Sequence, residues 1–153
     1  YKYVYKYISQ LNVMNEDVFF DRFINDDFYR SHVPSVFEWM CQQFLIRKNK
    51  LNKLEVPFFE IGKYYYDDPV NKRNGEFDVV TQDEKGYIFY ECKYKNSKVT
   101  QTVVDQEIEQ VKNVNMSCYK YGFFSKSGFD LTNDSNLISY TLDDLYHSFS
   151  ENI

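Results

Sequence analysis

Three charged residues in the middle of the chain have the types and the spacing needed to hydrolyse a phosphodiester bond. Glu91 and Lys93 lie two positions apart in the β-prone run 87–93, so alternation along a strand places both side chains on one face. Asp78 lies in the preceding β-prone run, 75–82. Carboxylate oxygens are the ligands that Mg²⁺ and Mn²⁺ prefer, and a neighbouring ammonium group can stabilise charge that develops on a phosphate.

The loop between these two runs decides whether the acids meet. A four-residue loop that ends at Gly86 and a two-residue loop give the same register, in which Val80 faces Phe89 and Asp78 faces Glu91. A three-residue loop would shift this register by one position. In the register that places Asp78 opposite Glu91, the Cβ atoms of these two acids lie roughly 4.5–5.5 Å apart. Two negative charges at this distance are destabilising unless a divalent cation lies between them.

The segments around this hairpin predict an α/β fold with an N-terminal helical segment. From residue 34 the predicted order is α-β-β-β-α-β, and Pro34 suits the first turn of the first of these helices. A separate helix over 16–29, capped by Asn15, precedes it. We expect residues 34–153 to form one domain, while the helical segment 1–33 either belongs to it or is the tail of a preceding domain. The other predicted elements are helices over 34–48 and 100–114, strands over 56–66, 75–82, 87–95 and 118–125, and a last helix that begins at a capping box of Thr141 and Asp144.

The composition excludes several classes of protein. A length of 153 residues suits one domain with its own core, and 20% aromatic residues exclude a disordered chain. The sequence has no apolar run long enough to span a membrane, no signal-peptide pattern and three cysteines without paired spacing, so we expect a reduced, cytoplasmic protein with no membrane partner. The net charge is −5, but segment 45–100 carries +2, so an anion-binding surface is expected there.

The charged residues and their order along the chain resemble a known family. Asp78 followed by Glu91-Cys92-Lys93 resembles the signature of the PD-(D/E)xK, or restriction-endonuclease-like, nuclease superfamily, with Phe77 where the name has proline. Over about residues 35–130 the chain is similar to one subfamily, the nuclease-like domain of unknown function that follows the P-loop ATPase module of archaeal-type AAA+ ATPases. The motifs that carry this similarity are Phe37-Glu38, Ile61-Gly62, Gly75-Glu76-Phe77-Asp78, Glu91-Cys92-Lys93 and the run 124–129.

This resemblance implies a fold, a reaction and a set of site residues. The fold would be a restriction-endonuclease-like core with a mixed central sheet, and the reaction would be metal-dependent hydrolysis of DNA. Asp78 and Glu91 match the acids that bind Mg²⁺ or Mn²⁺, Lys93 matches the catalytic lysine, and Glu38 matches an extra acid beside the metal. The implied partners are DNA and the N-terminal P-loop ATPase module. This chain has no GxxxxGK[ST] loop, so ATP would act only through a module outside this sequence.

The same residues also have a less specific interpretation. Asp78, Glu91 and Lys93 can form a solvated cluster on a sheet face, and the domain is then a catalytically inactive module that binds DNA or a protein and regulates the ATPase. The acidic segment 101–153, with a net charge of −5, favours a protein partner for such a module. A component of a toxin–antitoxin or defence system is a third class that the sequence does not separate from these two.

Four neighbours of the candidate residues receive structural interpretations. We expect Glu76 to be solvated at the start of its strand, and Cys92 to face away from Glu91 as a small buried residue. Gln106 and Gln110, on the helix after the hairpin, are expected to face water rather than to line the site.

Overall fold

The computed structural model describes residues 7–26, 28–70, 72–132 and 137–150. The chain divides into two compact units, Tyr1–Phe37 and Glu38–Ile153, each of which is described by itself. Of the helices in the described ranges, none has the length and the apolar character needed to cross a bilayer.

The first unit is helical, as predicted. Its elements are α2 (Ile8–Leu11), α3 (Glu16–Phe19) and two π-helical segments, η1 (Phe20–Asn25) and η2 (Phe28–His32). Asn15 caps α3, because its side-chain oxygen accepts the backbone N–H of Asp17 at 3.0 Å and that of Val18 at 3.4 Å. The predicted cap is therefore confirmed, while the predicted helix 16–29 widens into π turns from Phe20 onward.

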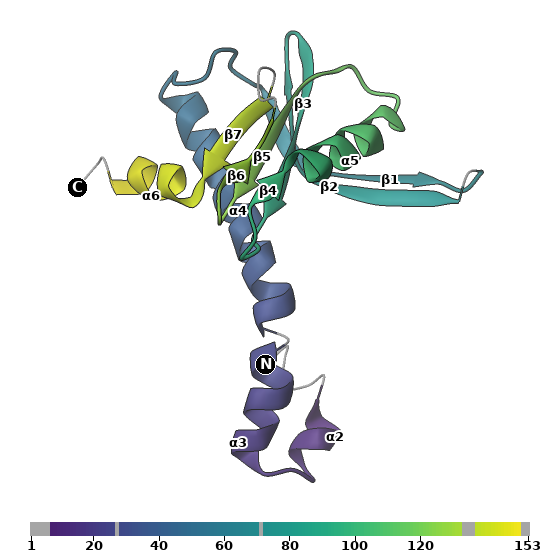
Figure 1. Cartoon of the computed structure of the whole chain (residues 1–153), viewed down its shortest axis with the longest axis vertical. Helices are drawn as coiled ribbons and strands as arrows, with labels where there is room; N and C mark the ends of the chain where they lie inside the picture. Colours follow the sequence, from purple (N-terminus) through teal and green to yellow (C-terminus); the bar gives the residue numbers. More distant parts are fainter. Residues whose placement is uncertain (1–6, 27, 71, 133–136, 151–153) are drawn as a thin grey trace. The chain divides into compact units, whose positions relative to one another are not determined.

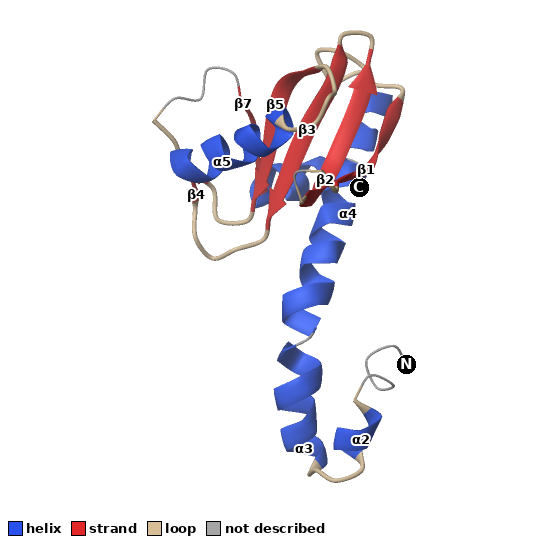
Figure 2. Cartoon of the chain, turned by 90° about the vertical axis from the view of Figure 1, so that its right-hand side faces the viewer, coloured by secondary structure: helices blue, strands red, loops and turns tan. Residues whose placement is uncertain are grey.

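The second unit contains a five-stranded sheet in the order β1-β2-β3-β5-β7 (Figures 1 and 2). Strands β1, β2 and β3 pair antiparallel, whereas β3, β5 and β7 pair parallel, so the sheet is mixed, as predicted. A short parallel pair, β4 with β6, lies outside this sheet. The strands are β1 (Glu60–Asp68), β2 (Arg73–Asp83), β3 (Gly86–Lys93), β4 (Val99–Thr100), β5 (Cys118–Ser125), β6 (Phe129–Asp130) and β7 (Leu137–Thr141), and the helices are α4 (Val33–Lys50), α5 (Gln101–Lys112) and α6 (Leu142–Ser150).

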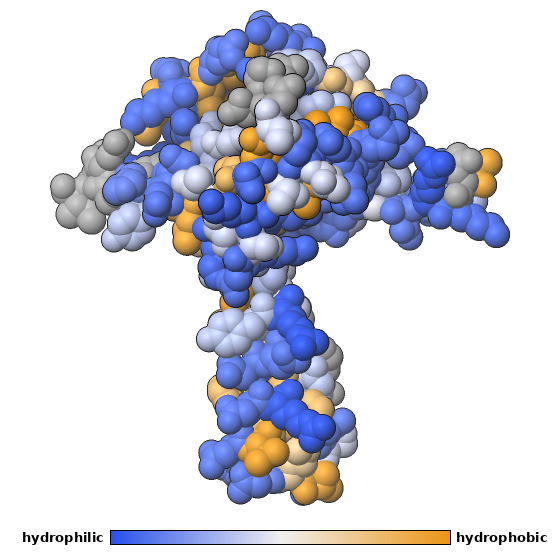
Figure 3. Space-filling model, in the orientation of Figure 1, coloured by the Kyte–Doolittle hydropathy of each residue, from blue (hydrophilic) through white to orange (hydrophobic). Residues whose placement is uncertain are grey.

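Helices cover both faces of this sheet (Figure 2). On one face, Val111 of α5 packs in a core cluster with Phe89 of β3. On the other face, the ring of Phe44 of α4 lies 5.8 Å from that of Phe124 of β5. Successive residues of a strand point to opposite faces, so Phe123 joins the α5 side while Phe124 joins the α4 side. The face of this unit seen in Figure 3 is mainly hydrophilic, which agrees with apolar side chains gathered between the layers.

Four strands differ from the sequence prediction. The strand expected over 56–66 begins only at Glu60, because Asn49 of α4 binds both backbone groups of Phe58 and holds the preceding segment as a loop. Strands β4, β6 and β7 were not predicted, although the capping box that follows β7 was. That box is confirmed: the Asp144 carboxylate accepts the backbone N–H of Thr141 at 2.7 Å and its hydroxyl at 2.8 Å.

The turn between β2 and β3 sets the register of the hairpin. Asp83 pairs with Gly86, so the loop has two residues, and Val80 pairs with Phe89 as predicted. Gly86 has a φ of 136°, a conformation that L side chains rarely adopt. A Cβ at this position would also collide with the carbonyl oxygen of Ser117, which accepts the N–H of Tyr87 at 2.9 Å.

We expect Gly86→Ala to lower the free energy of unfolding by about 1–3 kcal/mol, because alanine must adopt a strained φ and displace the Ser117 carbonyl. Gly62→Ala is the matched control, since a Cβ at Gly62 of β1 meets no atom within 4 Å. Urea unfolding of both variants measures the difference. Equal stabilities would show that the turn does not require glycine.

Candidate functional site

The candidate site begins at an irregularity in the pairing of β1 with β2. The register of this ladder shifts by one residue between Gly62 and Tyr64. Two consecutive residues of β2, Asp78 and Val79, therefore oppose the single β1 residue Lys63, which is the pattern of a β-bulge. A bulge bends the strand and redirects side chains, so Asp78 departs from the plain alternation of the hairpin.

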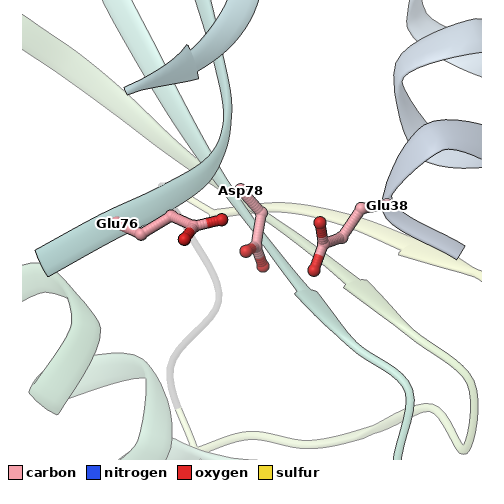
Figure 4. Close-up of side chains that lie close together, drawn as sticks. All are labelled: Glu38, Glu76 and Asp78. Atoms are coloured by element: carbon pink, nitrogen blue, oxygen red, sulfur yellow. The ribbon is translucent and has the colours of Figure 1, made fainter. Parts of the chain in front are cut away.

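Three carboxylates converge at this bulge (Figure 4). Glu38 of α4 and Glu76 and Asp78 of β2 each offer an oxygen, and these oxygens all lie within 4.8 Å of one another. Glu76 is exposed, as expected for a solvated residue, yet it belongs to this group rather than standing apart. Glu38, which the sequence connected to the site only through the resemblance, lies beside Asp78.

The donor set of this acidic group fits a hard divalent cation. Such ions bind carboxylate oxygens at about 2.0–2.6 Å, so oxygens that share one ion lie at most about 4–5 Å apart. Three carboxylates at this spacing are ligands suited to Mg²⁺ or Mn²⁺. Lys63 supplies the positive charge here: its Nζ lies 2.7 Å from Glu38 Oε2 and also contacts Glu76 Oε1.

A backbone group ties Asp78 to the next strand. The register of β2 with β3 runs from Asp83 and Gly86 to Val79 and Tyr90 and does not extend to the predicted pair of Asp78 with Glu91. Beyond it, the N–H of Cys92 donates to Asp78 Oδ2 at 2.8 Å. Burial raises the pKa of Asp78; the Cys92 N–H opposes this shift and the charge of Glu38 adds to it. Asp78 thus connects the acidic group of β2 to the β3 residues that carry the rest of the predicted site.

Lys93 lies between two carboxylates on the α5 side of β3. Its Nζ donates to Glu91 Oε1 at 2.6 Å and to Glu107 Oε1 of α5 at 2.7 Å, so Glu91 and Lys93 share a face as predicted. Burial raises the pKa of Glu91, and the charge of Asp78 raises it further. Burial alone would lower the pKa of Lys93, but Glu91 and Glu107 outweigh it and keep the ammonium charged. Among the described residues, Glu91 lies outside the group of converging acids formed by Glu38, Glu76 and Asp78.

Sequence reasoning missed Lys63 and Glu107. Glu107 had a readable signal, because it falls within the apolar stripe of its helix, three residues after Val104 and four before Val111, where a charged residue needs a partner. Lys63 had none, since its position opposite Asp78 depends on the bulge.

The other three residues given structural interpretations, Cys92, Gln106 and Gln110, are not members of the acidic group. The thiol of Cys92 meets that of Cys41 of α4, so Cys92 faces away from Glu91 as expected. Gln106 is exposed, and the amide of Gln110 lies beside Gly75 at the start of β2.

The raised pKa values predict how stability depends on pH. A folded chain that holds carboxyl protons more tightly than the unfolded chain gains stability that is complete below the ordinary Glu pKa of 4.5 and is lost as pH rises through the raised value. Glu91→Gln removes one such group and does not lose this stability as pH rises. We therefore expect its free energy of unfolding, measured relative to that of wild type, to increase by at least about 1 kcal/mol from about pH 5 to about pH 8.

Urea unfolding in EDTA at both pH values measures this difference. Glu84→Gln, at an exposed acid in the turn of the same hairpin, is the control and should show the same stability relative to wild type at each pH. A constant difference between Glu91→Gln and wild type would contradict the raised pKa of Glu91.

Comparisons with known proteins place the chain in a family. Residues 1–111 match the family model DUF234, described as archaea bacterial proteins of unknown function. An uncharacterized protein of Methanocaldococcus jannaschii, MJECL04, is 31% identical over 99 residues, which are 63% of this chain and 21% of that protein; the chain thus spans about a fifth of this relative. The crystal structure of a protein of unknown function, AF1548, superposes with a TM-score of 0.45 and 13% identity, over 70% of this chain and 65% of that one. The chain belongs to the DUF234 family of archaeal and bacterial proteins of unknown function.

Proposed function

We propose that residues 34–153 form a nuclease-like domain of the PD-(D/E)xK type, which hydrolyses DNA phosphodiesters with the help of a divalent cation. The observation that carries the proposal is the meeting of two groups at the β2–β3 hairpin. The acidic group of Glu38, Glu76 and Asp78 suits a cation, and Lys93 is held on the neighbouring strand by Glu91. Asp78 connects the two groups through the N–H of Cys92.

Each residue has a defined role in this reaction. Asp78 and Glu38 would hold Mg²⁺ or Mn²⁺, with Glu91 as a further oxygen donor close enough to Asp78 for the two charges to interact. The bound cation would supply an activated water and would withdraw charge from the scissile phosphate. Lys93 would donate a hydrogen bond to a phosphate oxygen as negative charge develops there. Glu107 orients Lys93 from α5.

A second candidate function is a catalytically inactive module that binds DNA or a partner protein. The observation in its favour is that both lysines of the site already contact carboxylates. Lys93 is shared by Glu91 and Glu107, and Lys63 bridges two further acids, so both ammonium groups have carboxylate partners in this arrangement.

The domain would work as one part of a longer, cytoplasmic protein. Because the chain spans about a fifth of its Methanocaldococcus jannaschii relative, most of such a protein lies outside this sequence. We propose that an N-terminal P-loop ATPase module lies there and delivers DNA to the candidate site.

The nuclease proposal is tested with supercoiled plasmid and Mn²⁺. We expect wild type to nick the plasmid, and Asp78→Ala and Lys93→Ala each to reduce the rate on the order of 100-fold, because each removes a group that stabilises the transition state. Glu84→Ala and Lys85→Ala, which change an exposed acid and an exposed base in the turn of the same hairpin, should keep the wild-type rate. Identical nicking by wild type, Asp78→Ala and Lys93→Ala would refute the catalytic role and leave the binding module.

A further inference from the structure

We propose that Lys63 is a built-in competitor of the metal, whose ammonium group holds the cation position between Glu38 and Glu76 until a divalent ion displaces it. The inference rests on the proposed function, because it concerns the loading of the same acidic group. It adds that Lys63, a residue outside the sequence motif, controls when the site binds a divalent ion.

The position of the ammonium is incompatible with a cation bound by the same oxygens. Lys63 Nζ lies 2.7 Å from Glu38 Oε2 and also contacts Glu76 Oε1, so it takes up one oxygen from each of two members of the acidic group. A divalent ion shared by the three carboxylates would need to approach such oxygens to about 2.0–2.6 Å. A metal and the ammonium therefore cannot occupy this position together.

The fold fixes the backbone of Lys63 but not the end of its side chain. The β1–β2 ladder is paired on both sides of it, at Gly62 with Val80 and at Tyr64 with Phe77. The side chain is 30% exposed, and a lysine stem has four flexible carbons, so the ammonium can move into water while the strand stays paired. Displacement therefore needs only a change of rotamer.

The charges explain why the lysine stays until a stronger cation arrives. Three carboxylates with oxygens within 4.8 Å of one another repel, and Lys63 offsets part of this repulsion in the metal-free protein. Its two ion pairs hold the ammonium group between Glu38 and Glu76. Lys93 does not play this part, because its contacts are with Glu91 and Glu107.

The test compares Mn²⁺ binding, by calorimetric titration, to wild type, Lys63→Met and Lys85→Met. We expect Lys63→Met to bind Mn²⁺ at least about tenfold more tightly than wild type, because the ion no longer displaces an ammonium group. Lys85→Met makes the same change of net charge at an exposed position in the β2–β3 turn and should bind as wild type does. Lys63→Gln, which is neutral and still able to donate a hydrogen bond to Glu38, should bind more tightly as well and serves if the methionine variant does not fold.

Thermal unfolding gives a second readout that does not depend on activity. Metal-free Lys63→Met should melt below wild type, and saturating Mn²⁺ should raise its midpoint by more than it raises that of wild type. If the Lys63 variants bind Mn²⁺ as tightly as wild type or more weakly, Lys63 is not a competitor of the metal, while the proposed metal centre is still supported. Absence of Mn²⁺ binding in every variant would overturn the metal centre and this inference together.

Discussion

Crowded negative charge is the constraint on which the geometry of this site depends. Five carboxylates lie around the end of the β2–β3 hairpin, and like charges at such spacing repel strongly when they are partly withdrawn from water. Two lysines divide the task of compensation: Lys63 contacts one pair of acids and Lys93 contacts another. The remaining carboxylate, that of Asp78, receives a backbone N–H. The groups that make these contacts lie on β1, β2, β3, α4 and α5, so the sheet and both covering helices must be in place before the charges balance.

The β-bulge is what lets a single hairpin serve both faces of the sheet. Glu91 and Lys93 follow the regular alternation of β3 and face α5, where Glu107 meets them. Asp78, redirected by the bulge, is close to Glu38 of α4 on one side and to the N–H of Cys92 on the other. Without the extra residue in β2, regular alternation would direct Asp78 to the same face of the sheet as Glu91. Asp78 would then not meet Glu38 of α4.

The sequence predicted those features that depend on neighbours along the chain. The cap at Asn15, the capping box at Thr141 and the β2–β3 register from the turn to Val79 and Tyr90 all follow from local turn chemistry and periodicity, and all are present. The late start of β1 was not predicted, because it depends on Asn49 binding Phe58 across a loop. The bulge was not predicted either, since it arises from pairing between two strands and leaves no mark in the periodicity of one. Lys63 and Glu38 could therefore not be placed beside Asp78 from spacing alone.

The acids of the site form two separate groups, and for this reason Lys93 can be ion-paired and still have a catalytic role. A lysine ammonium has three N–H donors, and the contacts of Lys93 with Glu91 and Glu107 use two of them. The third can meet a phosphate oxygen while the two carboxylates hold the group in a fixed direction, so in a nuclease these ion pairs orient Lys93 rather than neutralise it. Lys63 differs because its partners are the carboxylates of Glu38 and Glu76, which a metal would need as ligands. The same type of contact therefore orients one lysine and makes the other a competitor, and the difference lies in which carboxylates each of them contacts.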